Sequence, residues 1–243
     1  MCLLAVRWRS VPGLPLVLAA NRDESYARPF DPPRIHGGPV PFLAPVDRTA
    51  GGTWLGLNAA GLAVAVTNRP QREVVATRRS RGLLAAEALG ASGIDSLRDR
   101  LERHLRGGAP YNNFHLVAAS ADGAFVVRYH DGWSDFVDLE PGDHFLTNED
   151  ELDEPAVAGV SAAAAAGAGA EARRLAGVLA SHEPCLPGGR APCKHGEGGG
   201  TVSASVLAVP DAGPGGAALL YAGGPPCTAP WEDLSPLLRG LAP

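Results

Sequence analysis

Apolar positions in the first part of the chain form short runs that suit strands rather than helices. Residues 3–8 and 16–20 are two such runs, and Pro12-Gly13 between them is typical of a turn. We therefore predict a β-hairpin. Its second strand leads directly into the polar quartet Asn21-Arg22-Asp23-Glu24. A strand end holds side chains rigidly beside open space, so this quartet is a candidate site.

Strand and helix patterns alternate through the middle of the chain. A second hairpin is predicted over residues 53–58 and 62–68, and it ends in Asn68. Apolar residues with helical spacing follow in residues 80–106, where we predict two helices. Their expected N-caps are Ser80 for the first helix and Ser92 or Asp95 for the second. Three strands joined by Asp-Gly turns are predicted at residues 114–120, 124–130 and 133–137.

The last third of the chain contains an alanine-rich segment, a loop and a final hairpin. A helix is predicted over residues 161–181, and the glycine- and proline-rich residues 184–200 are expected to form a loop. Two strands and a short helix complete the chain, at residues 202–209, 217–222 and 231–238. This order of elements predicts an α+β fold with antiparallel sheets. No early shift in composition marks a linker, so we expect one domain over residues 1–243.

Composition and charge narrow the class of protein. Hydrophobic residues make up 45% of the chain and charged residues 19%, with a formal net charge of -5. These values are typical of a globular protein with a sizeable core. The absence of a long basic run argues against a nucleic-acid surface. Several arginines near residue 80 suit a solvated face, or else an acidic ligand; they are Arg72, Arg78, Arg79 and Arg81.

The sequence also bears on the compartment. No uninterrupted apolar run has the length of a membrane span, and Arg7, Arg9, Pro12 and Pro15 interrupt what would be the core of a signal peptide. We therefore expect a cytoplasmic protein without stable membrane insertion. In that reducing compartment the four cysteines are expected to be free thiols or ligands rather than disulfides.

Cys2 is the strongest chemical candidate in the chain. Because the second residue is small, methionine aminopeptidase is expected to remove Met1, which would give Cys2 both a thiol and a free α-amine. The reference pKa of such an amine is about 7.7–8.0 and that of the thiol about 8.5, so the amine can act as a base for the thiol. Cys2 would then start an acyl transfer. The alternative is a small apolar residue that opens an edge strand.

Several segments spread along the chain carry a combined pattern. They are Cys2, Asn21-Arg22-Asp23-Glu24, Gly51-Gly52-Thr53-Trp54-Leu55-Gly56-Leu57-Asn58, Thr67-Asn68, Tyr111-Asn112-Asn113-Phe114-His115-Leu116 and Thr147-Asn148. Together they resemble the NRDE family, also called the transport-and-Golgi-organisation proteins. The resemblance covers most of the chain and implies a four-layer αββα sandwich of two antiparallel sheets, like that of N-terminal nucleophile hydrolases. Relatives usually carry an arginine where this chain has Val202, which leaves the substrate class open.

The resemblance extends to a hydrolase branch that uses a terminal cysteine and includes bile-salt and penicillin acylases. It implies Cys2 as the nucleophile, Asp23 as the group that orients its amine, Asn148 as an oxyanion donor and Arg22 as the cation beside the thiolate. The implied reaction is hydrolysis of a non-peptide amide or ester bond of a small acyl substrate through a thioester. The wider family implies another function, that of a carrier or chaperone. In it, the nucleophile site no longer catalyses a reaction and instead serves as a binding pocket for haem or acyl lipid.

Five further side chains are expected to bind the substrate. They are Asn21, Glu24, Trp54, Asn68 and His195. These residues also have structural interpretations, as have the catalytic candidates. Arg22 and Asp23 can form a surface ion pair, and the asparagines can satisfy backbone groups in turns. Trp54 can be a core residue, and Glu24 can pair with Arg28.

Two histidines and two cysteines raise the question of a metal. The donors of a tetrahedral zinc site are present in His182, Cys185, Cys193 and His195. Seven residues separate the two cysteines, however, and neither end shows the two-residue spacing of zinc modules. We therefore expect no metal and no cofactor, and we expect His195 to line the pocket instead. Cys227 has no predicted role.

Overall fold

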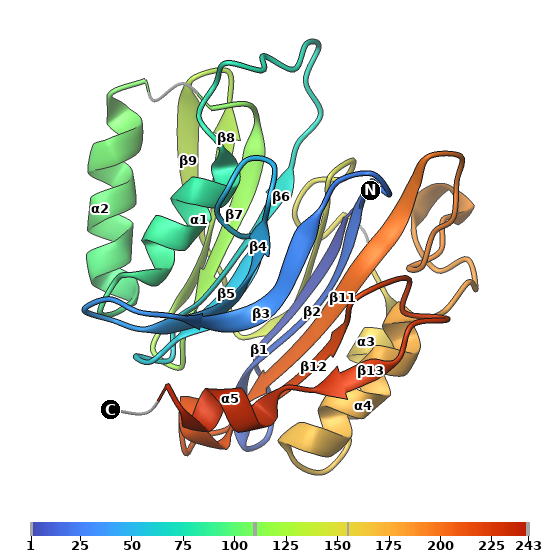
Figure 1. Ribbon diagram of the computed structural model, residues 1–243. Helices are drawn as coiled ribbons and strands as arrows, with labels where there is room; N and C mark the ends of the chain where they lie inside the picture. The colour runs from blue at the N-terminus through green and yellow to red at the C-terminus, as the bar shows by residue number, and fades with distance from the viewer. Residues whose placement is uncertain (1, 109–110, 155, 242–243) are drawn as a thin grey trace. The chain divides into compact units, whose positions relative to one another are not determined.

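The computed structural model describes residues 2–108, 111–154 and 156–241, which divide into two compact units. The first unit is built from Met1–Arg28 and Pro141–Gly240, and the second mainly from Pro29–Glu140. Each unit contains one antiparallel sheet with helices packed on it (Figure 1). The predicted α+β class with two antiparallel sheets is confirmed. One domain over residues 1–243 stays a prediction.

The sheet of the first unit has six strands in the order β10-β1-β2-β11-β12-β13. Their bounds are β1 Leu3–Val11, β2 Leu14–Ser25, β10 Gly142–Thr147, β11 Gly199–Val209, β12 Ala218–Ala222 and β13 Trp231–Asp233. The hairpins β1-β2 and β11-β12 are those that the sequence predicts. Since β10 pairs with β1 and β11 pairs with β2, segments from distant parts of the chain lie next to the N-terminal hairpin.

The helix α4 (Ala168–Leu179) packs on β2, β11 and β12 of this sheet, and α3 (Ala158–Ser161) packs on α4. Leu175 and Leu179 of α4 share a buried cluster with Leu3 and Val17 of the hairpin. Burial of each such side chain stabilises the fold by roughly 1.5–3 kcal/mol. Two 3-10 helices and a short α-helix complete the unit, at Pro187–Gly189, Pro214–Gly216 and Ser235–Arg239 (α5).

Two predicted helices in this unit are wrong in part. The single helix expected over residues 161–181 is broken between α3 and α4, and Gly167 at the break has a φ of 82°. That conformation is open to glycine at little cost and is not helical, so no helix can run through residue 167, which is the N-cap of α4. The helix expected over residues 231–238 is also shorter. Trp231–Asp233 forms the edge strand β13 instead, and only the residues after it turn into α5.

The sheet of the second unit has seven strands in sequence order. Their bounds are β3 Phe30–His36, β4 Phe42–Asp47, β5 Leu55–Asn58, β6 Ala63–Asn68, β7 Phe114–Ala119, β8 Ala124–His130 and β9 Trp133–Asp138. The hairpin β5-β6 and the meander β7-β8-β9 confirm the sequence pattern. The strands β3 and β4 were not predicted, because Pro32, Pro33 and Pro45 weaken any strand pattern there.

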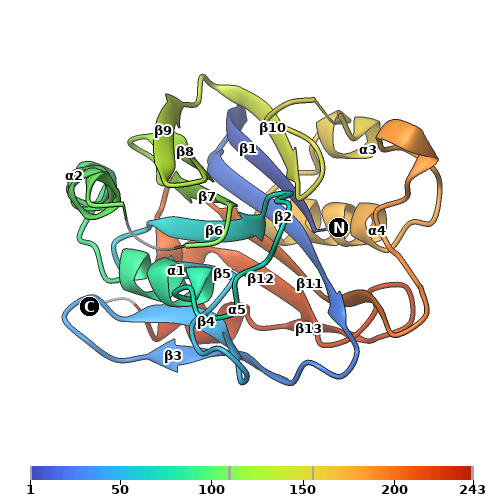
Figure 2. The same cartoon turned by 90° about the horizontal axis from the view of Figure 1, so that it is seen from above.

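The helices α1 (Arg81–Leu89) and α2 (Ile94–Arg106) belong to this second unit, and Figure 2 looks nearly along α2. They bury leucines against the sheet in one cluster with Phe114 and Phe125. The N-cap of α1 is Ser80 as predicted, although its side chain makes no capping bond. The N-cap of α2 is Gly93 rather than Ser92 or Asp95.

The glycine-rich run of the resemblance has a packing role in this unit. Gly52 has a φ of 78°, and a Cβ atom built there would lie 2.1 Å from the backbone of Gly82 in α1. The Thr53 backbone N–H donates to the Gly82 carbonyl at 2.9 Å. A side chain at position 52 would therefore push α1 away from the sheet.

None of the helices in the described part of the chain is both long and apolar enough to cross a membrane. The longest of them, α2, has 13 residues.

Candidate functional site

Cys2 lies in the first unit where β1 begins and β10 ends, whereas β2 continues to Ser25. The polar quartet at residues 21–24 therefore lies inside β2, paired with β11, rather than after the strand end as predicted. Leu3, the first residue of β1, lies opposite Asn21 of β2 and Thr147 of β10. Because both neighbours run antiparallel to β1, the residues that follow them, Arg22 and Asn148, extend toward the end of the sheet where Cys2 lies. The Cys2 Sγ atom is 3.7 Å from the backbone carbonyl oxygen of Asp23. The four predicted catalytic residues thus come from one end of one sheet.

Asp23 is held from the opposite side by β11. The Thr201 hydroxyl donates to the Asp23 Oδ1 atom at 2.7 Å, and it accepts the Lys194 backbone N–H at 3.0 Å. A pocket of about 350 Å³ opens here. Its lining residues are Asp23, Glu24, Lys194, His195, Gly196, Gly199 and Gly200. Three predicted site residues, Asp23, Glu24 and His195, therefore share this pocket.

The Cys2 thiol is half-buried, and its surroundings favour the protonated form. Desolvation raises the pKa of Cys2 most, and the negative charge of Asp23 raises it further. A backbone contact with Asp23 and the positive charge of Arg22 act in the opposite direction but do not outweigh burial. Arg22 is itself only 7% exposed. The expected effect of Arg22 on the thiol is present, yet it is not dominant.

Asn148 lies in a tight turn that follows β10. The Thr147 hydroxyl donates to the Asp150 Oδ2 atom at 2.7 Å and accepts the Glu149 and Asp150 backbone N–H groups. Arg190 donates to the carboxylates of Glu149 and Asp150 at 2.6 and 2.5 Å. Within the described residues, the buried Asn148 Oδ1 atom has no hydrogen-bond partner. The turn is therefore fixed, while the Asn148 amide oxygen retains the capacity to accept a hydrogen bond.

Asn21 and Glu24 have structural partners. The Asn21 Nδ2 group donates to the backbone oxygens of Leu179 and Pro192 at 3.0 and 2.8 Å, and Asn21 is 2% exposed. This places its amide toward α4. The Glu24 Oε2 atom lies 3.6 Å from Arg28 and 3.9 Å from Arg22, so the pairing of Glu24 with Arg28 is present.

Trp54 and Asn68 belong to the second unit. Trp54 is half-buried and packs edge-on against Phe30 with ring centroids 5.8 Å apart. Asn68 is exposed at the end of β6, opposite Phe114 of β7. Val202, which stands where relatives usually carry an arginine, is buried in the first unit at an irregularity between β2 and β11.

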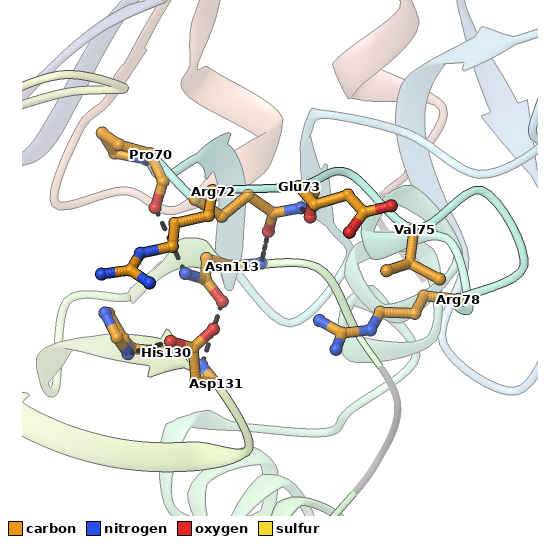
Figure 3. Close-up of a pocket in the computed structure, with 9 residues that line it drawn as sticks. Pro70, Arg72, Glu73, Val75, Arg78, Asn113, His130 and Asp131 are labelled. Carbon is orange, nitrogen blue, oxygen red and sulfur yellow. Dashed lines mark hydrogen bonds and ion pairs between the residues drawn. The ribbon is translucent and has the colours of Figure 1, made fainter.

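The second unit has a pocket of its own, of about 800 Å³ (Figure 3). Arg72 and Arg78 line it, and Asn113 lies between them. Asn113 accepts the Asp131 backbone N–H at 3.0 Å and donates to the Pro70 carbonyl at 3.2 Å. The other two arginines of the predicted basic group are not among the lining residues: Arg79 bonds Glu87 and Tyr111, and Arg81 bonds the Asn113 carbonyl.

Sequence reasoning missed three residues that this geometry brings to the site region. Thr201 contacts Asp23 across strands that are 178 residues apart in the chain. Arg190, in the predicted loop at residues 184–200, donates to the two carboxylates that follow Asn148 in its turn. Cys227 lies 3.2 Å from the His195 Nε2 atom, whereas Cys185 is not part of that group. These contacts join segments that are far apart in the chain, so no local sequence pattern predicts them.

Comparison with known proteins agrees with the resemblance. Residues 1–164 match the family described as Transport and Golgi organisation 2. Over 140 residues the chain is 39% identical to the Transport and Golgi organization protein 2 homolog of Bos taurus and 36% identical to that of Homo sapiens. Each alignment covers 55% of this chain and 50% of the relative, so the chain spans about half the length of the curated relatives it matches.

The fold is similar to that of a solved hydrolase. The crystal structure of the C2A mutant of conjugated bile acid hydrolase from Clostridium perfringens matches with a TM-score of 0.51, at 11% identity and with 96% of each chain covered. The predicted N-terminal nucleophile hydrolase-like fold is thereby confirmed. Since the family match spans more than half of the sequence, the chain belongs to the Transport and Golgi organisation 2 family, which is also called the NRDE family.

Proposed function

We propose that this protein is an N-terminal cysteine hydrolase that cleaves a non-peptide amide or ester bond of a small molecule. The observation that carries the proposal is the position of Cys2. Its sulfur lies 3.7 Å from the Asp23 carbonyl oxygen, and the Asp23 carboxylate is fixed by Thr201. A conjugated bile acid hydrolase shares the fold, which supports hydrolysis as a reaction that this fold can accommodate.

Removal of Met1 activates the site in this proposal. The burial of Cys2 and the charge of Asp23 raise its thiol pKa, so a nearby cation is needed for thiolate formation. A free α-ammonium on Cys2 supplies that cation, and Asp23 stabilises it. In its neutral form, the amine takes the thiol proton directly or through one water.

The reaction then proceeds in two halves. The thiolate attacks the substrate carbonyl carbon and forms a tetrahedral oxyanion, which accepts a hydrogen bond from the Asn148 amide. The C–N or C–O bond breaks as the ammonium returns its proton to the leaving group, and a thioester remains on Cys2. Water gives a proton to the amine and attacks the thioester, which releases the acid and restores the thiol.

Two measurements test this proposal: the intact mass of the purified protein, and the order in which an acyl electrophile labels its cysteines. We expect the purified protein to lack Met1, and we expect the electrophile to modify Cys2 before Cys185, Cys193 and Cys227. Cys185→Ser is the matched control, because Cys185 is also half-buried and burial also raises its pKa. Retention of Met1 in a protein that still hydrolyses N-acyl amides or esters would overturn the proposal.

A second function, haem or acyl-lipid binding on the same fold, is supported by the raised pKa of Cys2. A thiol that stays protonated is a poor nucleophile, so a raised pKa of Cys2 favours binding over turnover. Titration with haem and with long-chain acyl thioesters distinguishes the two functions. Saturable, stoichiometric binding that survives Cys2→Ala, without turnover by the native protein, supports the binding function. Absence of such binding removes it.

A further inference from the structure

Four side chains with metal-binding donors converge in the first unit, outside the residues that match the family. The donor atoms of this cluster all lie within 4.8 Å of one another, and the residues are His182, Cys193, His195 and Cys227. The spacing between Cys185 and Cys193 is unlike that of a zinc module, and for that reason the sequence predicts no metal. In the fold, however, Cys227 joins the group in place of Cys185.

We propose that this cluster is a closed tetrahedral zinc site with two thiolate and two imidazole ligands. A zinc ion with Zn–S bonds of about 2.3 Å and Zn–N bonds of about 2.0–2.1 Å requires ligand atoms roughly 3.3–3.8 Å apart. The His195 Nε2 atom is 3.2 Å from the Cys227 sulfur and 3.9 Å from the Cys193 sulfur. Small side-chain rotations therefore suffice to close the site.

The backbone already holds the three segments of the cluster together. The Cys193 backbone N–H donates to the Ser181 carbonyl at 3.0 Å, which brings the residue before His182 beside Cys193. Cys227 lies in a turn that is closed by a bond from the Ala229 N–H to the Pro225 carbonyl at 2.8 Å. These hydrogen bonds belong to the fold itself, so a bound metal would have to order few additional backbone groups.

The chemistry of the cluster favours zinc over other divalent ions. Sulfur and imidazole nitrogen suit a borderline-soft ion, whereas magnesium and calcium prefer oxygen. Two thiolates balance the charge of Zn²⁺, so the complex adds no net charge to a region in which Cys193 is buried. Four protein ligands fill the tetrahedral shell, which makes the site structural rather than catalytic.

The site would connect the end of α4, the 193–195 segment and the turn after β12. Lys194 lies between two of the ligands, and its backbone bonds Thr201, the residue that donates to Asp23. The zinc would thereby stabilise the wall of the smaller pocket without taking part in the reaction. This proposal does not depend on Cys2, so Cys2→Ala should bind zinc as the native protein does.

The test is metal binding by the full chain under reducing conditions. We expect one zinc per chain, and we expect Co²⁺ in its place to give the visible bands of a tetrahedral site together with thiolate charge-transfer absorption. Cys193→Ser and Cys227→Ser should each weaken zinc binding at least 100-fold. Cys185→Ser, the matched control, should change it less than threefold.

Three results would overturn the proposal. They are less than 0.2 zinc per chain at saturating free zinc on the order of 10 µM, cobalt spectra without thiolate absorption, and equal loss of affinity in Cys185→Ser and Cys227→Ser. The cobalt spectrum is measured on the native chain, so it remains decisive even if a cysteine variant fails to fold. His195→Gln gives a further check at an exposed position and should also weaken binding.

Discussion

The strand β1 carries two polar clusters of opposite character. Near its middle, Arg7 bonds Asp143 at 3.0 Å and Glu171 at 2.9 Å, and Arg174 also bonds Glu171, at 2.6 Å. At its start, the Cys2 thiol makes one weak contact with a backbone oxygen, and the neighbouring Asn148 Oδ1 atom has no partner among the described residues. One cluster is saturated with hydrogen bonds, while the other retains capacity for a ligand.

The two clusters show how a structural polar group differs from a functional one. Glu171 is fully buried and accepts bonds from Arg7, Arg174 and the Ala165 backbone N–H, so its cost of desolvation is offset. No such offset applies to a thiol whose burial raises its pKa. The first cluster should therefore govern stability, and the second should govern chemistry.

The largest expected effect is on activity, from Cys2→Ala. We expect hydrolysis to fall by about 10³-fold or more, because the nucleophile is lost, while the free energy of unfolding changes by less than about 1 kcal/mol. Steady-state kinetics and urea unfolding of the same preparation measure both quantities. A larger loss in the free energy of unfolding than in the activation free energy of hydrolysis would contradict the distinction between the two clusters.

The next effect is on stability, from Glu171→Gln. This change leaves the buried Arg7 without one of its counter-charges, and breaking such a pair costs about 3–5 kcal/mol. Urea unfolding should report that loss, whereas the rate of electrophile labelling at Cys2 in the folded protein should stay within twofold. Glu154→Gln, at an exposed position in the same unit, is the control. A loss below about 1 kcal/mol would show that the network is not structural.

Asn148→Ala should lower kcat about 10²- to 10³-fold, which corresponds to about 3–4 kcal/mol of lost oxyanion stabilisation. KM should change little, because the bond is made to the transition state rather than to the ground state. Asn148→Asp serves as the matched comparison, since it keeps the size of the side chain and removes the N–H donor. Equal activity of the native protein and both variants would exclude Asn148 as the donor.

The sequence was sufficient for the local parts of this picture and insufficient for the long-range parts. The hairpin β1-β2 and the polar residues at its end follow from apolar alternation and from Pro12-Gly13, which act over a few residues. The contact between Thr201 and Asp23 depends on the register of β2 against β11, and local patterning does not specify that register.

The same limit explains the other errors. Cys227 lies 32 residues beyond His195, so no motif spacing links the two, and only folding brings them to 3.2 Å. The break between α3 and α4 required knowing that Gly167 adopts a positive φ, since glycine within an alanine-rich segment only weakens a helix. Tertiary packing brings Cys227 to His195, and backbone geometry at Gly167 separates α3 from α4.

A smaller effect on stability is expected from Thr201→Val. The variant keeps the shape of the side chain but removes the hydroxyl that donates to Asp23 at 2.7 Å, and a hydrogen bond to a charged group contributes about 1.5–3 kcal/mol. Unfolding in urea should show that loss, and labelling of Cys2 should slow as well. Thr201→Ser restores the hydroxyl and should recover both. If Cys2 is labelled as fast in Thr201→Val as in Thr201→Ser, Thr201 does not position Asp23 for the reaction.

The smallest effect is a dependence of stability on acid that the saturated cluster produces. Burial by itself would raise the pKa of Glu171, but hydrogen bonds from Arg174 and Ala165 and the charge of Arg174 hold it below the usual value. The pKa of Asp143 is likewise lowered, because hydrogen bonds from Ser10 and Arg7 overcome the effect of its burial.

A carboxylate whose pKa is lower in the folded state binds fewer protons there than in the unfolded chain. Its stabilisation is therefore complete above about pH 5 and is lost as the pH falls through the folded pKa, at about 1.4 kcal/mol per unit of difference. The free energy of unfolding should decline from pH 5 toward pH 3, and Glu171→Gln should flatten that decline. An equal slope in the variant would assign the acid sensitivity to other carboxylates.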